Sequence, residues 1–201
     1  MRVRQIPVGP MKNFDYLLTE DVSGEAIAID SGWETGPVVR AAREDGAKVV
    51  YVVATHGHYD HVETLAELAE KLEARTVAHE VSELATDVRV RDGDALRIGG
   101  VDVRVIHTPG HTPDSICLFD GSNLFTGDTL FIGNCGRTDL PGGSARELFH
   151  SLHSVLLSLP GKAVVYPGHD YGEVPSRSLE EEARKNPTLL ARSLGEFAGV
   201  E

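Results

Sequence analysis

Residues 55–61 decide how this chain is organised, and they read Thr55-His56-Gly57-His58-Tyr59-Asp60-His61. The stretch brings three imidazoles and one carboxylate together within a few positions of one another. Imidazole and carboxylate groups are the ligands that suit Zn(II), Fe(II) and Mn(II). An ordinary surface loop has no use for so many of them. The sequence therefore predicts a metal site in this stretch.

The segments on either side indicate where the stretch lies. The run before it, residues 48–54, is apolar and rich in β-branched side chains, and it has the length of a buried strand. The run after it, residues 62–72, repeats apolar side chains at helical spacing. The stretch is thus predicted to form a strand-to-helix turn. We expect His56 and His58 to reach one point from the loop, and Asp60 and His61 to reach a second point from the helix start.

Length and composition limit the class of protein. The chain has 201 residues, of which 41% are hydrophobic and 25% charged, values typical of a soluble globular domain. The net charge of −12 and the lack of a basic run argue against nucleic acid or a membrane as partner. No apolar run is long enough to cross a bilayer, and no signal-peptide pattern opens the chain. Two cysteines, Cys117 and Cys135, indicate no disulfide framework and favour a cytoplasmic location.

Strands and helices recur in two similar rounds along the chain. The predicted strands cover residues 3–8, 13–19, 26–30, 48–54, 76–79, 96–98, 101–107, 115–119, 123–126 and 162–166. The predicted helices cover 37–45, 61–73, 144–156 and 178–184, and the tail after Pro187 is also expected to be helical. This order predicts an α/β fold with two packed sheets and outer helices, in a single domain over residues 1–201.

Three later strand ends also carry residues of the metal-binding type. They are His111, Asp128 and His169, and each follows a glycine that lets the backbone turn sharply. With the four groups of residues 55–61, they provide seven ligands on one edge of the scaffold, which is enough for two metal ions.

These seven ligands divide naturally into two sets. One ion would be held by His56, His58 and His111, the other by Asp60, His61 and His169, with Asp128 as a bridge. A water between two such ions loses its proton near neutral pH and becomes a nucleophile, which Asp60 would orient as a catalytic residue.

The same residues also contain a smaller ligand set, which would hold a single ion. His56, His111 and Asp128 alone form a set of two histidines and one carboxylate. Such a set leaves positions open for substrate and dioxygen on Fe(II). The ligands therefore specify a metalloenzyme and leave both chemistries open. A non-catalytic metal or redox module is a third, weaker alternative.

Taken together, these motifs resemble the metallo-β-lactamase superfamily, whose T-H-x-H-x-D-H signature corresponds to residues 55–61. The resemblance covers nearly the whole chain. It implies a four-layer αββα sandwich, with two mixed sheets and helices outside, and a metal site along one edge. Residues 108–113 (TPGHTP) and 125–129 (FTGDT) are similar to the glyoxalase II-like branch of that superfamily.

Two further segments resemble the persulfide dioxygenases within this branch: residues 135–139 (CGRTD) and 166–172 (YPGHDYG). That resemblance implies Fe(II) on His56, His111 and Asp128 and oxidation of glutathione persulfide to sulfite and glutathione. It further implies that Arg137 and Tyr171 hold the thiol, and it suggests a homodimer. The chain departs from the usual Phe-Gln after CGRTD, with Leu140 and Pro141 in their place.

The other reading within this branch is a glyoxalase II-like hydrolase of hydroxyacylglutathione thioesters, with two zinc, iron or manganese ions. The chain lacks room for the long C-terminal domain that holds glutathione in many such enzymes, since only about 30 residues follow His169. Either way, the expected partner is a small glutathione-type thiol.

Several polar residues are expected outside the ligand set. We expect Asp170 to orient a ligand histidine through a hydrogen bond. The acidic run 180–182 is expected to form a solvated helix face. The remaining histidines are expected to be structural: His79, His107, His150 and His153.

Overall fold

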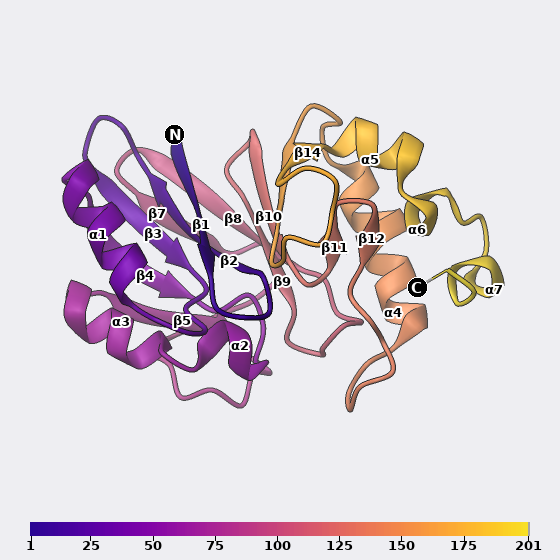
Figure 1. Ribbon diagram of the computed structural model, residues 1–201, viewed down its shortest axis with the longest axis horizontal. Coiled ribbons are helices and arrows are strands. Elements are labelled where there is room, and N and C mark those ends of the chain that lie inside the picture. The colour runs from indigo at the N-terminus through magenta and orange to yellow at the C-terminus, as the bar shows by residue number, and fades with distance from the viewer. Residues whose placement is uncertain (201) are drawn as a thin grey trace.

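The computed structural model describes residues 1–200, which form two six-stranded sheets (Figure 1). The strands of the first sheet, in spatial order, are β1 (Arg2–Val8), β2 (Asn13–Thr19), β3 (Glu25–Ile29), β4 (Lys48–Val53), β5 (Arg75–His79) and β6 (Val88–Val90). β1, β2 and β3 pair antiparallel, whereas β3 to β6 pair parallel. The parallel strands are joined by crossovers, as their apolar sequences predict.

The second sheet is also mixed. Its strands, in spatial order, are β14 (Arg177–Ser178), β13 (Val164–Pro167), β10 (Asn123–Gly127), β9 (Ile116–Phe119), β8 (Val101–His107) and β7 (Ala95–Ile98). β10 and β13 are parallel, and the other pairs are antiparallel. A separate short ribbon consists of β11 (Leu130–Phe131) and β12 (Asn134–Cys135).

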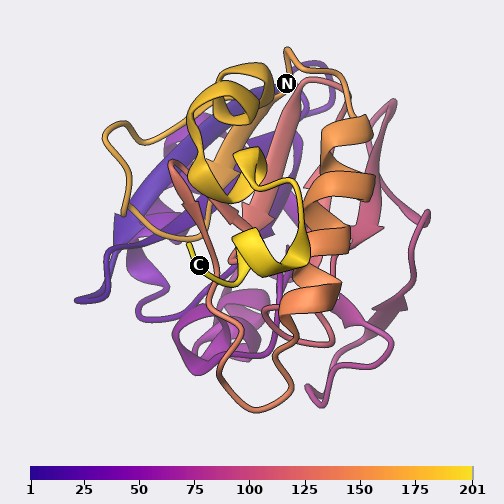
Figure 2. The ribbon, with the colours of Figure 1, turned by 90° about the vertical axis from the view of Figure 1, so that its right-hand side faces the viewer.

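Helices cover the outer face of each sheet. On the first sheet lie α1 (Gly36–Asp45) and α3 (Leu65–Leu72), with the single turn α2 (Tyr59–Val62) at its edge (Figure 1). On the second lie α4 (Ala145–His150) with its continuation through Ser151–Val155 and Leu156–Ser158, and the later helices α5 (Leu179–Lys185), α6 (Pro187–Leu190) and α7 (Leu194–Phe197) (Figure 2). The predicted four-layer αββα sandwich is confirmed. None of the helices in residues 1–200 has the length and apolar character that a bilayer crossing requires.

Three apolar clusters correspond to the three interfaces between these layers. The central one joins the two sheets and includes Tyr16, Ile29, Val105 and Phe125, all buried. One outer cluster packs α1 and α3 on the first sheet, and the other packs the second group of helices on the second sheet. Because both sheets are covered by helices or by each other, most buried residues of the strands are apolar, and the polar cluster of the molecule lies where the strands end.

The structure corrects some predicted elements. The helix expected over 61–73 is interrupted at Thr64, whose backbone leaves the helical region (φ −108°, ψ 14°) and whose N–H bonds the Ser31 carbonyl. The helix expected over 144–156 changes to wider turns after His150. Glu182, expected on a solvated face, is fully buried and bonded to Arg177. Propensity alone could not predict the break at Thr64 or the burial of Glu182, because each involves a partner distant in sequence, Ser31 and Gly133 respectively.

Candidate metal centre

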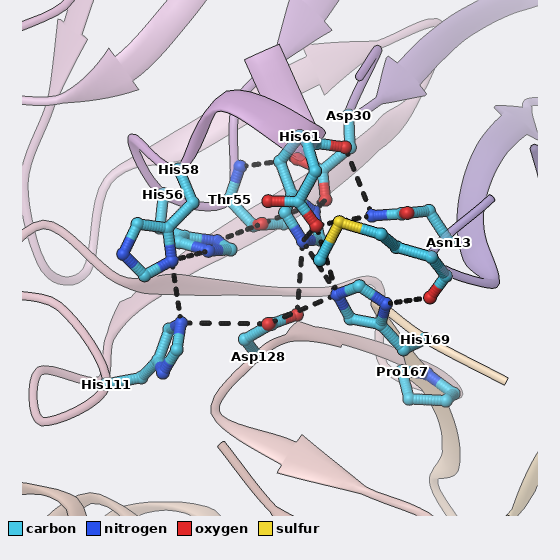
Figure 3. A network of polar contacts seen from close by, with 12 residues as sticks. Asn13, Asp30, Thr55, His56, His58, His61, His111, Asp128, Pro167 and His169 are labelled. Atoms are coloured by element: carbon cyan, nitrogen blue, oxygen red, sulfur yellow. Dashed lines mark hydrogen bonds and ion pairs between the residues drawn. The ribbon is translucent and has the colours of Figure 1, made fainter. Parts of the chain in front are cut away.

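The predicted ligands come together from four strand ends, one in the first sheet and three in the second (Figure 3). His56 and His58 lie in the loop after β4, and Asp60 and His61 lie in α2. The other three follow β8, β10 and β13 and are His111, Asp128 and His169. The convergence that the sequence predicted is therefore present.

One group of donor atoms comprises His56, His58 and His111, which lie within 4.8 Å of one another. His58 Nδ1 is 3.1 Å from His56 Nε2 and 2.9 Å from His111 Nε2. A metal that binds nitrogen at about 2.1 Å in a tetrahedral arrangement keeps its ligand atoms about 3.4 Å apart. The spacing of the three nitrogens thus fits one cation.

The second group comprises Asp60, His61 and His169, again within 4.8 Å of one another. Asp60 Oδ2 is 3.6 Å from His61 Nε2 and 3.4 Å from His169 Nε2, and the two nitrogens are 3.2 Å apart. All three distances are close to the edge of a tetrahedron around one ion. This group also fits a cation, so the residues present suit either one or two ions.

Asp128 lies between these two groups and forms a third donor group with His56 and His61. Its Oδ2 is 3.6 Å from His111 Nε2 and 3.3 Å from His169 Nε2, while its Oδ1 is 3.3 Å from His61 Nε2. Oδ1 is buried, and no described residue donates a hydrogen bond to it. A buried carboxylate oxygen without a donor is costly unless a cation satisfies it. This is the observation that best fits the site to a metal.

Hydrogen bonds on the far ring nitrogens orient three of the histidines. His61 Nδ1 bonds Asp30 Oδ2 at 2.9 Å, His111 Nδ1 bonds the Arg137 carbonyl at 2.7 Å, and His169 Nδ1 bonds the Met11 carbonyl at 2.9 Å. Each bond leaves Nε2 facing the centre.

Asp30 is a functional residue that sequence reasoning missed. Its carboxylate accepts hydrogen bonds from the Thr55 N–H (2.8 Å) and hydroxyl (2.9 Å) as well as contacting His61. Its backbone is left-handed, with φ 61°, which is uncommon for a residue other than glycine. The orienting carboxylate is thus Asp30. Asp170, which we expected in this role, is exposed and uses its backbone N–H to bond Lys12.

The electrostatics of the centre favour positive charge. Burial lowers the pKa of His56, and the neighbouring His61 lowers it further, so the His56 lone pair is available to a metal. Burial acts in the same direction on His61, but the charges of Asp128 and Asp30 outweigh it and raise the pKa of that imidazole. Burial opposes ionisation of Asp128, yet His61 and His169 hold its pKa well below the usual range.

Two glycines allow the backbone to pass close to these ligands. A Cβ on Gly168 would lie 2.4 Å from Asp128 Oδ1 and 2.9 Å from His61 Cε1. A Cβ on Gly136 would lie 1.9 Å from the Asp128 carbonyl oxygen and 2.9 Å from His111 Nδ1. Only glycine fits at such close approaches. The CGRTD segment can therefore lie directly over His111 and Asp128.

A cavity of about 650 Å³ opens onto the centre, and its walls are largely apolar and aromatic. Both predicted substrate residues, Arg137 and Tyr171, line it. Arg137 is exposed and paired with Asp139 through two bonds of 2.5 and 2.6 Å. The Tyr171 ring stacks on His169, with centroids 4.6 Å apart.

The remaining histidines lie outside the donor groups of the described residues. The rings of His79 and His107 stack with centroids 3.9 Å apart, and His153 Nε2 donates to the Thr188 carbonyl at 3.0 Å. His150 is exposed on α4. Their contacts agree with the structural role expected for them.

A two-sheet sandwich with clustered histidines and carboxylates on one edge defines a class of metal-dependent enzymes. The family model described as "Metallo-beta-lactamase superfamily" matches residues 9–85 and 78–169. The chain belongs to the metallo-beta-lactamase superfamily, as an enzyme with a metal centre.

Three similar proteins illustrate its place there. The human protein "Persulfide dioxygenase ETHE1, mitochondrial" is 39% identical over 191 residues, covering 93% of this chain and 75% of its own. The "Probable polyketide biosynthesis zinc-dependent hydrolase BaeB" of Bacillus velezensis is 33% identical, covering 87% of this chain and 80% of its own. The crystal structure of ETHE1 from Myxococcus xanthus superimposes with a TM-score of 0.92 at 36% identity, covering 98% of this chain and 88% of its own.

Proposed function

We propose that this protein is a persulfide dioxygenase that acts on the persulfide of a glutathione-type thiol. In the overall reaction, the persulfide, dioxygen and one water give the free thiol, sulfite and two protons. The terminal sulfur is oxidised, the sulfur–sulfur bond breaks, and dioxygen is reduced. The observation that carries the proposal is the position of the CGRTD segment, residues 135–139, over His111 and Asp128. The 39% identity to a human persulfide dioxygenase supports it.

In this proposal, His56, His111 and Asp128 hold Fe(II). Bound Fe(II) would supply open coordination positions and redox activity for dioxygen, while the electrons that reduce dioxygen come from the persulfide sulfur. The chain itself contributes orientation and shelter. The Arg137 carbonyl fixes the His111 ring, and the apolar wall, which includes Phe131 and Ile132, limits the access of water.

The thiol carrier would be held by the outer part of the cavity. The Arg137 guanidinium keeps donors beyond the two that Asp139 accepts, so it can still bind a substrate carboxylate. The Tyr171 hydroxyl is available at the rim, because 53% of this residue is exposed. A single cation at the rim suits an anionic substrate of a protein whose net charge is −12.

The test combines elemental analysis with an oxygen electrode. Protein loaded anaerobically with Fe(II) is expected to consume dioxygen only when glutathione persulfide is added, and to release sulfite. His111→Ala should reduce the rate at least about 100-fold, since it removes one of three ligands. His150→Ala, exposed on α4, is the matched control and should retain the rate. Loading with iron but no oxygen uptake would exclude the proposal.

A second candidate is a dinuclear hydrolase of hydroxyacylglutathione thioesters, in which water adds to the carbonyl and the thiol leaves. The specific observation in its favour is the complete second donor group, Asp60, His61 and His169. Asp60 would orient the attacking hydroxide there. Thioester hydrolysis that is lost in Asp60→Ala and in His169→Ala would favour this function. Hydrolysis that persists in both variants would argue against it.

We further propose that the protein works as a cytoplasmic homodimer without a nucleic-acid partner. The acidic net charge supports the absence of nucleic acid. Light scattering of the purified protein tests the dimer: a mass near twice 21.7 kDa is expected.

A further inference from the structure

Asn13 connects the metal centre to the one tryptophan of the chain. Its side chain is buried, with 1% exposed. The amide nitrogen donates to Asp60 Oδ2 at 2.9 Å and to the Asp60 carbonyl at 3.1 Å. The amide oxygen accepts from Trp33 Nε1 at 2.8 Å. Because an indole N–H can only donate, this bond determines that the amide oxygen faces Trp33 and the NH₂ faces Asp60.

The backbone around Asn13 is fixed by the strand end that carries His169. The Phe14 N–H donates to the Gly168 carbonyl at 2.9 Å, and Met11 accepts from His169 Nδ1. These hydrogen bonds therefore attach the turn between β1 and β2 to the strand end that carries His169. Asn13 lies beside that histidine (Figure 3).

Contacts on two sides fix the position of the Trp33 ring. Its ring packs directly over Gly9, where an added Cβ would come within 2.1–2.4 Å of the indole. Its other side meets the Tyr59 ring edge-on, with centroids 5.8 Å apart. The indole thus has one position, and through its N–H it gives the Asn13 amide one orientation.

The atom at the end of this arrangement is Asp60 Oδ2, the same oxygen that faces His61 and His169 at 3.6 and 3.4 Å. We propose that Asn13, oriented by Trp33, is a positioning residue that holds Asp60 Oδ2 in place and so sets the affinity of the second position for a divalent cation. This inference depends on the centre binding metal. It requires that the donor group Asp60, His61 and His169 can bind a second cation in addition to the one that the proposed dioxygenase function uses.

The experiment is a titration of metal-free protein with Zn(II) in a competing chelator, with bound metal counted by elemental analysis. The wild type should bind two ions in separate steps. Asn13→Ala should weaken the second step by about 10–100-fold, which is typical for loss of a hydrogen bond to a metal ligand, and leave the first step unchanged. Trp33→Phe keeps an aromatic ring but removes the pyrrole part of the indole with its N–H, so the Asn13 amide loses its orienting donor while its bond to Asp60 can still form, and the second step should weaken less.

Trp33 also provides an independent readout, because the chain contains one tryptophan. Its emission should change with the second ion and remain constant during the first. Asn123→Ala, at the start of β10 and bonded to Asp120, is the control variant and should bind both ions as the wild type does. Circular dichroism confirms that each variant is folded.

The outcomes distinguish failure of this inference from failure of the proposed function. A wild type that binds one ion under all conditions overturns the inference, as does an equal effect of Asn13→Ala on both steps. If Asn13→Ala does not fold, Trp33→Phe decides: an unchanged second step contradicts the inference. A failed oxygen assay with intact two-step binding would remove only the proposed dioxygenase function.

Discussion

Three histidines at the centre use their two ring nitrogens for different contacts. His61, His111 and His169 each keep Nε2 for the centre because Nδ1 is bonded to a carboxylate or a backbone carbonyl. Glycines stand where the chain passes closest to these rings. A change of one atom at such a position alters the centre more than a large change elsewhere on the surface.

Gly136→Ala tests this at the point of closest approach. The new methyl group would collide with the Asp128 carbonyl and crowd His111, so we expect metal affinity to fall by at least about 10-fold. Elemental analysis after dialysis against a weak chelator measures the loss. Gly195→Ala, where a Cβ meets nothing within 4 Å, is the matched control. Unchanged metal content in Gly136→Ala would contradict the account of this loop.

Asp15 gives a pH dependence at the same scale. Its carboxyl group is buried, without an ordinary hydrogen bond from any described residue. Burial, together with the charge of Asp30, raises its pKa from 3.8 to about 8, and the charge of His61 and the Gly32 backbone offset this only in part. Between these two values the unfolded chain releases the proton while the folded protein keeps it. The stability contributed by the group is therefore lost as pH rises from about 4 to about 8.

Asp15→Asn removes this dependence, because the amide stays neutral. We expect the stability of metal-free Asp15→Asn relative to the wild type to increase with pH, by about 3–4 kcal/mol between pH 5 and pH 8. Urea unfolding at several pH values measures the difference. Asp102→Asn, exposed on β8, should leave the slope unaltered over that range. Parallel curves for Asp15→Asn and wild type would exclude a raised pKa.

At the scale of elements, the C-terminal helices support the wall of the cavity. The Glu182 carboxylate on α5 is fully buried and accepts from Arg177 (3.0 Å), the Gly133 N–H (2.8 Å) and Asn186 (3.0 Å). Gly133 lies in the turn between β11 and β12, which lines the cavity. This bond, together with those from the Asn186 amide to the Phe131 and Asn134 carbonyls, ties the short ribbon to the C-terminal helices.

Glu182→Gln is expected to lower the free energy of unfolding by about 3 kcal/mol, since it leaves Arg177 without its buried partner. It should also raise KM more than it lowers kcat, because the displaced ribbon belongs to the substrate cavity. Denaturant unfolding and steady-state kinetics measure the two effects. Glu181→Gln, one residue earlier and exposed, should cost less than about 0.5 kcal/mol. Similar losses in both variants would rule out this role.

At the scale of the whole molecule, the centre joins the two halves. The loop after β4 in the first sheet and the helix α2 provide four candidate ligands, His56, His58, Asp60 and His61. The second sheet provides the other three. A bound cation would therefore link segments that are otherwise held together by the apolar interface between the sheets. Metal binding and the stability of the whole fold are coupled for this reason.

Removal of metal should consequently lower the melting temperature. An ion present at about 100 times its Kd stabilises the folded state by about 2.7 kcal/mol, which corresponds to roughly 5–10 °C for a chain of this size. Calorimetry with and without EDTA measures the shift. Asp128→Ala should show little response to EDTA. Identical melting of the wild type under both conditions would mean that no ion links the halves.

The fold and the meeting of the ligands were predictable because they depend on local patterns. Apolar runs define the strands, and residues 55–61 with His111, Asp128 and His169 follow the ends of such runs. Parallel strands place their carboxyl ends on one edge, so residues distant in sequence had to meet there.

What only the tertiary structure decided is which groups surround those ligands. Nothing local distinguishes Asp30 from Asp170 as the partner of a histidine, or Glu182 from its exposed neighbours, or joins Asn13 to Trp33 and Asp60. Each of these contacts spans two layers or two turns, and its existence depends on how the packed sheets bring the loops together. Sequence thus determined the candidate ligands of this protein, and packing determined their orientation, because a hydrogen bond depends on distances that only the assembled fold sets.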